Sequence, residues 1–250
     1  MTSPAQRHMM RVSAIEAAQR DDNPLRHATA YEQMLVKLAA DRAKLKQIYS
    51  VETKAKHKRA MLPDYAPWVA GVLAEGRGAQ DDVLMTVMQW KLDAGDIPGA
   101  LEIARYALKY GLKTPRNKRP TPYLLAEDVA LAAMRNRTAG EAVAVTDLLE
   151  TLDMLAAEDM PDVVSARLHK ITGLILSDRS EFAQALEHLK RAMQLDSAAG
   201  VKKEIQRCES ALKPKPAPAK KPTTTRPRKA AKTPAKRGRP PKAAKTKAAG

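Results

Sequence analysis

Residues 25–68 read LRHATAYEQMLVKLAADRAKLKQIYSVETKAKHKRAMLPDYAPW, and this stretch organises the rest of the chain. It contains no glycine and no proline between Leu25 and Leu62, which predicts one long helix. We expect Pro63 and Pro67 to end that helix and turn the chain. Along it, apolar and aromatic side chains recur at spacings of three, four and seven, as in the seam of a coiled coil or a helix hairpin: Tyr31, Leu35, Leu38, Leu45 and Tyr49.

A basic block follows the seam in the same predicted helix. Cations placed together in this way attract a polyanion such as the phosphate backbone of DNA. A shorter predicted helix over residues 5–20 adds further basic side chains, so we expect residues 1–66 to form a region for DNA binding and oligomerisation. The candidate DNA-binding residues of this region are Arg7, His8, Arg11, Lys54, Lys56, Lys58 and Arg59.

The composition predicts an all-α protein. Hydrophobic residues make up 44% of the chain but aromatic residues only 4%, so the core must consist mainly of Leu, Ala, Val and Met. Good helix formers dominate, and no stretch shows the sustained alternation of a strand. We expect a helical core over residues 67–212, with helices near 81–95, 99–110, 123–136, 140–157, 162–177, 181–195 and 199–212.

Two helix pairs of this core have small residues where antiparallel helices would touch. The first pair carries Ala100, Ala104 and Ala107 after Trp90, and the second places Gly173 opposite a run that includes Ala185, Leu189 and Ala192. The spacing is typical of tetratricopeptide repeats. It is equally what any close helix hairpin requires, so both interpretations stay open.

Other sequence features limit the location and redox chemistry. The single cysteine, Cys208, excludes an internal disulfide. The N-terminal residues lack the apolar run of a signal peptide, and no segment approaches the roughly 18 apolar residues of a membrane span. We therefore expect a soluble cytoplasmic protein that does not bind membranes.

The net charge of +16 is concentrated at the C-terminus. Residues 213–250 contain 14 Lys or Arg and no acids, which leaves 30 basic against 28 acidic residues in 1–212. Eight of the 17 prolines also lie in this tail, so we expect it to be disordered. By contrast, residues 140–162 are acidic, either as a solvated face or as a docking face for a basic partner.

The tail contains a motif that resembles the AT-hook, in which Arg-Gly-Arg-Pro lies in the minor groove of A·T-rich DNA. A merely polycationic tether that binds DNA without sequence preference is the alternative, and a tail that only adds solubility is a third. The residues that form the motif are Lys236, Arg237, Gly238, Arg239 and Pro240.

The sequence offers no clear catalytic or metal site. Asp81 and Asp82 lie in the densest early group of acids, but neighbouring residues of a helix point about 100° apart and would not chelate Mg²⁺ together easily. Acids at the start of a helix are more often caps that favour the helix dipole. The five histidines show no metal-ligand spacing, and there is no phosphate-binding loop for ATP hydrolysis. We assign no catalytic residue and no metal ligand.

Several long strings resemble the small terminase subunit of temperate, contractile-tailed phages with cohesive ends. They include LPDYAPWVAGVL, GAQDDVLMTVMQWKLDAGD, GALEIARYALKYGL and GVKKEIQRCESAL, together with residues 25–59. The likeness covers most of 1–212, is dense over 23–112 and excludes the tail. It implies DNA packaging in the host bacterial cytoplasm, a ring-forming homo-oligomer, and a large terminase subunit that carries Mg²⁺ and ATP. This chain itself would need no cofactor.

Three functions follow as hypotheses. In the first, the chain binds double-stranded DNA at the packaging site and works with the large ATPase subunit in cohesive-end cleavage and packaging. In the second, it carries endonuclease activity itself, since the family is often described as the endonuclease subunit. In the third, it is a tetratricopeptide-like adaptor with a non-specific DNA-binding tail.

Overall fold

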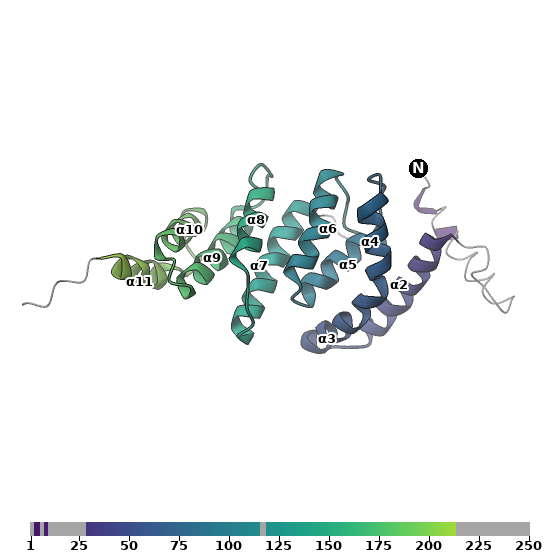
Figure 1. The fold of residues 1–250 in the computed structure, drawn as a ribbon, viewed down its shortest axis with the longest axis horizontal. Coiled ribbons are helices and arrows are strands. Elements are labelled where there is room, and N and C mark those ends of the chain that lie inside the picture. The colour runs from purple at the N-terminus through teal and green to yellow at the C-terminus, as the bar shows by residue number, and fades with distance from the viewer. Residues whose placement is uncertain (1–2, 6–7, 10–28, 116–118, 214–250) are drawn as a thin grey trace, which may run out of the picture. The chain divides into compact units, whose positions relative to one another are not determined.

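The computed structural model describes residues 3–5, 8–9, 29–115 and 119–213. Every regular element in these ranges is a helix, which confirms the all-α prediction for this part of the chain (Figure 1). The elements are α2 Ala30–Lys46, α3 Val51–Met61, the 3₁₀ helix η1 Leu62–Tyr65, α4 Ala66–Glu75, α5 Asp82–Asp93, α6 Ile97–Lys109, α7 Thr121–Ala139, α8 Val145–Met154, α9 Asp162–Asp178, α10 Phe182–Leu195 and α11 Lys202–Leu212.

The prediction of one long helix through residues 25–62 is wrong. The chain leaves the helix after Lys46, and α3 begins at Val51 after a turn of four residues (Figure 1). The Ser50 hydroxyl caps α3 by accepting a hydrogen bond from the backbone N–H of Thr53 at 3.2 Å. The chain therefore breaks the helix without glycine or proline, and the cap of Ser50 starts a new helix in its place.

The seam predicted along α2 packs inside the chain. Leu38 and Leu45 are buried in the same core as α5, and the Tyr31 ring stacks on Trp68 with 5.8 Å between centroids. Tyr49 lies in the turn and is 95% exposed, so it does not belong to the seam. Leu38 and Leu45 are thus already covered by their own chain and are not available to form a coiled coil with another copy.

Helix α5 is the centre of the first half of the core. It packs against α2, α3, η1, α4, α6 and α7, and most of its residues are buried. Its close neighbour α6 contributes Ala100, Ala104 and Ala107, each with no exposed surface. The predicted use of small residues at this helix contact is confirmed.

Helices α9 and α10 form the second hairpin predicted from the sequence. Gly173 of α9 meets α10 so closely that a Cβ atom on it would lie 2.7 Å from the Cγ of Leu189 and 3.1 Å from the carbonyl oxygen of Ala185. Helix α11 packs against this hairpin and buries Cys208, whose Sγ lies 3.6 Å from the hydroxyl of Ser177. The hairpins α5–α6 and α9–α10 are separated by α7 and α8 rather than stacked directly as repeats.

Contacts divide the chain between Lys213 and Pro214. The predicted disorder of the tail and its AT-hook-like motif therefore concern residues outside the described ranges. Within the ranges that are described, no helix is long and apolar enough to cross a membrane.

Candidate nucleic-acid interface

We call the turn 47–50 together with α3 and the end of α2 the α2–α3 corner. A buried carboxylate fastens it to the core. Asp41 is only 3% exposed and accepts hydrogen bonds from the Tyr65 hydroxyl at 2.8 Å, from Lys44 at 3.0 Å and from Lys37 at 3.2 Å. Burial alone would raise the pKa of Asp41, but these three donors outweigh it and the pKa is lowered. Lys37 also pairs with Asp64 at 2.8 Å, so one ionic network joins α2 to η1.

Two cations of the predicted basic block hold α3 on the core. Lys58 pairs with Asp93 at the C-terminal end of α5, and its side chain is only 16% exposed. Arg59 donates to the backbone carbonyl of Ala94, just beyond the same helix end. Cations are favoured there because the helix dipole is negative at its C-terminus. These two side chains therefore serve the fold first, whatever else they contact.

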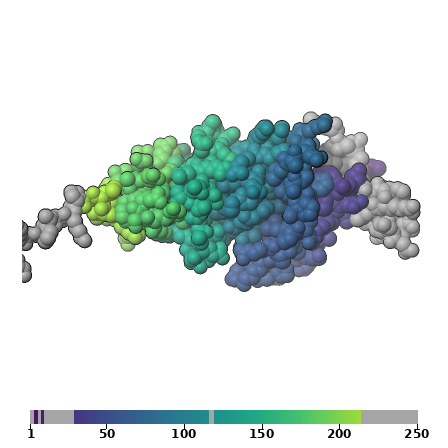
Figure 2. All heavy atoms as spheres, in the orientation of Figure 1, coloured from purple at the N-terminus to yellow at the C-terminus, as the bar shows by residue number. Residues whose placement is uncertain are grey.

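The remaining cations of the block point outward. No residue of α3 is buried, and Lys56 and His57 are exposed while Lys54 is partly exposed. Lys56 pairs with Glu52 of its own helix at 2.7 Å, and both side chains are more than two-thirds exposed. Such a surface pair contributes little to stability and is easily exchanged for a phosphate partner. In the space-filling view, the blue surface of this segment projects beyond the neighbouring helices (Figure 2).

Most of the other predicted DNA-binding residues lie outside the described ranges. This holds for Arg7 and Arg11 and for the motif Lys236–Pro240. His8 is described, adopts a helical conformation and is exposed.

The acids considered for a nuclease site are helix caps. Asp81 is 6% exposed, and one of its oxygens accepts from the backbone N–H groups of Val83 and Leu84, both at 2.8 Å. Its other oxygen accepts from the indole N–H of Trp68 at 2.9 Å. Asp82 donates its backbone N–H to the Tyr31 hydroxyl at 3.1 Å. Asp81 is thus the N-cap of α5 and Asp82 lies in its first turn, as the interpretation of these acids predicted. Both carboxylate oxygens of Asp81 already accept hydrogen bonds.

Among the described residues, no three or more His, Cys, Asp or Glu side chains gather closely enough to hold a metal ion. One pair that the sequence did not reveal is His169 of α9 and His188 of α10, whose Nδ1 atoms lie 3.0 Å apart. Burial, then His188 and Arg191, lower the pKa of His169 to about 4, so one neutral ring donates to the other. The register set by Gly173 and Leu189 could have predicted this contact.

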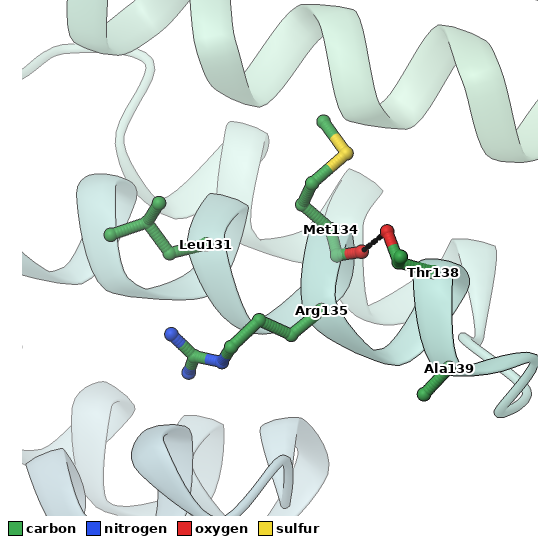
Figure 3. A pocket seen from close by; sticks show the side chains of 5 residues that line it. All are labelled: Leu131, Met134, Arg135, Thr138 and Ala139. Carbon is green, nitrogen blue, oxygen red and sulfur yellow. Dashed lines mark hydrogen bonds between the residues drawn. The ribbon is translucent and has the colours of Figure 1, made fainter. Parts of the chain in front are cut away.

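Two of the pockets on the described surface lie along α7 and beside α5. One, of about 390 Å³, runs along α7 and is lined by Leu131, Met134, Arg135, Thr138 and Ala139 (Figure 3). Figure 3 shows the Thr138 hydroxyl bonded to the Met134 carbonyl, at 2.8 Å, so the polar group is already satisfied. The other, of about 520 Å³, lies between η1–α4 and α5 and is lined mainly by apolar residues such as Leu62, Leu73 and Val87. Its lining also includes Lys91, which pairs with Asp96 at 2.7 Å.

The profile of the phage small terminase subunit family matches residues 35–163, a span that contains the α2–α3 corner and the whole of α5. The chain belongs to the phage small terminase subunit family.

Two curated relatives support the assignment of this terminase chain. It is 65% identical over 225 residues to the "Terminase, endonuclease subunit" of Escherichia phage P2, covering 90% of this chain and 91% of the relative. It is 24% identical over 198 residues to the "Probable terminase, endonuclease subunit" of Haemophilus phage HP1 (strain HP1c1), covering 73% and 70% respectively. No solved structure matches it. The resemblance stated from the sequence is thereby confirmed.

Proposed function

We propose that this terminase subunit binds double-stranded phage DNA through the outward face of the α2–α3 corner. On this proposal it positions the DNA for a large subunit that supplies Mg²⁺-dependent ATP hydrolysis during packaging in the infected cell. One observation carries the proposal: α3 is a helix without a buried residue, held to the core by Lys58 and Arg59, with Lys54, Lys56 and His57 turned away from it. A helix so presented can contact phosphates without disturbing the fold.

Charge along the chain supports the choice of this surface. Residues 30–61 contain eight Lys or Arg against three Asp or Glu, whereas residues 141–162 contain seven acids and no Lys or Arg. DNA is therefore attracted to the first segment and repelled by the second. The tail would add non-specific affinity, and assembly into an oligomer would multiply the number of corners that act on one DNA.

Salt-dependent binding tests the interface. The variant Lys54→Gln/Lys56→Gln removes one partly exposed and one exposed cation of α3, and the control Lys202→Gln/Lys203→Gln removes two exposed cations from the start of α11. Each phosphate contact contributes about 0.9 to the slope of log K against log salt, so the first variant should lower that slope by about 2. The control should leave it unchanged. Equal effects of both variants would mean that binding follows overall charge and not the α2–α3 corner.

A second candidate function is DNA cleavage by this chain, which the printed names of both relatives favour. It predicts Mg²⁺-dependent nicking of supercoiled DNA by the purified chain. The capping role of Asp81 argues against a centre at that position. We expect nicking only when the large subunit is added, and activity of the chain alone would establish the second function.

A further inference from the structure

An aromatic side chain stands free at the tip of the α2–α3 corner. Tyr49 lies in the turn and is 95% exposed, and Val51 is the first residue of α3 and is 73% exposed. Between α2 and α3 the neighbouring Ile48 packs against the core instead. Because both side chains are largely exposed, they contribute little to folding and are available for contact with a ligand.

The turn presents Tyr49 in a fixed position. On one side, the N–H of Gln47 bonds the last carbonyls of α2, those of Lys44 and Leu45. On the other side, the Ser50 hydroxyl caps α3. Because both flanking helices are closed by hydrogen bonds, little backbone freedom would be lost when the ring meets a ligand.

The surroundings of Tyr49 indicate which ligand. Lys46 precedes it and Lys54 follows it, and within the described ranges neither forms a salt bridge. The segment 30–61 is basic, with eight Lys or Arg against three Asp or Glu. An apolar tip set among unpaired cations is complementary to DNA, in which phosphates surround the stacked bases. A second copy docking the same basic surface would instead bring like charges together.

We propose that Tyr49 contacts the bases of duplex DNA, with its ring pressed against a base step while Lys54 and Lys56 bind the flanking phosphates. Val51 adds an apolar contact beside it. Many proteins that bend DNA insert an apolar wedge of this kind, and flexible pyrimidine–purine steps yield to it most easily. Tyr49 would thus make the binding depend on DNA sequence, which lysine–phosphate contacts cannot do. This inference rests on the proposed function of the corner.

Photochemical cross-linking tests the base contact. The full chain is bound to a random-sequence 40-base-pair duplex in which thymine is replaced by 5-bromouracil, irradiated, digested and analysed by mass spectrometry. The expected product is a peptide cross-linked through Tyr49, because bromouracil reacts only with groups that touch the base. Cross-links confined to other residues in a saturated complex would overturn the inference.

Affinity measurements complete the test. A base-stacked aromatic loses about tenfold in affinity or more on truncation to alanine, so Tyr49→Ala should weaken duplex binding by that factor with an unchanged salt slope. Tyr49→Phe, which keeps the ring, should retain the affinity of the parent chain for duplex DNA. The control Val163→Ala removes another apolar side chain, 45% exposed, at the edge of the acidic segment and should have no effect.

The outcomes separate the inference from the function it rests on. If Lys54→Gln/Lys56→Gln weakens binding while Tyr49→Ala does not, the interface stands and the base contact is refuted. If neither variant changes binding, both proposals fail. If Tyr49→Ala lowers the mass of the protein in solution, the ring belongs to a contact between copies and the inference is overturned.

Discussion

The close approach of α9 and α10 makes Gly173→Ala a sharp test of the fold. A methyl group at this position would lie 2.7 Å from the Cγ of Leu189, 2.9 Å from its Cδ2 and 3.1 Å from the carbonyl of Ala185. Carbon atoms in contact normally lie 3.5–4.0 Å apart, so the overlap is about 1 Å. Leu189 has no exposed surface and its Cγ cannot swing away, so one helix must shift.

The magnitude follows from two opposing effects. Over-packing of this kind costs about 1–3 kcal/mol, whereas alanine in place of glycine within a helix gains about 1 kcal/mol. We therefore expect Gly173→Ala to lower the free energy of unfolding by up to about 2 kcal/mol. The matched control is Gly71→Ala in α4, where a Cβ would meet no atom within 4 Å and the helix gain should appear alone.

Urea unfolding followed by circular dichroism measures both variants against the parent chain. The free energy of unfolding of Gly173→Ala should lie about 1–3 kcal/mol below that of Gly71→Ala. The urea dependence should stay the same, which would show that the extent of unfolding is unchanged. If Gly173→Ala proved as stable as Gly71→Ala, α9 and α10 would not approach as closely as described.

Three further predictions concern titrating and capping groups. Burial, followed by the charges of Asp93 and Glu127, raises the pKa of Asp128 from 3.8 to about 6. The folded chain therefore binds the extra proton, and the contribution of this group to stability should be lost as pH rises from about 4 to 6, by up to about 3 kcal/mol. Asp128→Asn removes this contribution, so its urea midpoint should increase relative to that of the parent over this range and exceed it at pH 7.5. For His169, whose pKa is lowered to about 4, the pH dependence of stability has the opposite sign, and stability should be lost as pH falls from about 6.5 to 4. His169→Gln/His188→Gln should remove that loss. An unchanged pH dependence in this variant would mean that the two rings are solvated. Asp81→Ala leaves the start of α5 and the Trp68 indole without their acceptor, so it should lower the free energy of unfolding by about 1–3 kcal/mol and with it the melting temperature. Asp81→Asn should lower the melting temperature less. The control is Glu75→Ala, at an exposed residue at the end of α4.

The helices of residues 82–212 could be predicted from sequence because local signals mark their ends. Asp96 accepts from the backbone N–H of Gly99 at 3.0 Å at the start of α6, and glycines with positive φ follow α5, α6 and α7. The break between α2 and α3 was missed because its only marker is Ser50, a residue that also occurs within helices. Periodicity showed which residues of α2 face inward but not that α5, rather than another copy, covers them.

The candidate interface could be predicted only in part. The basic block is visible in the sequence as a run of cations. In the structure, Lys58 and Arg59 bind the end of α5, in contrast to Lys54, Lys56 and His57. Which cations of the block bind the core therefore depends on where α5 ends. That position is a tertiary contact and has no local signal. The network of Asp41 and the exposure of Tyr49 were hidden for the same reason.

The absence of any buried residue in α3 bears on how such a subunit diverges. Apart from Lys58, Arg59 and Met61, which contact the core, substitutions at the exposed positions of this helix are nearly neutral for stability. Under the proposed function, a different packaging site would be accommodated by substitutions on the exposed face of this helix, one residue at a time, while α5 and the helices around it stay the same.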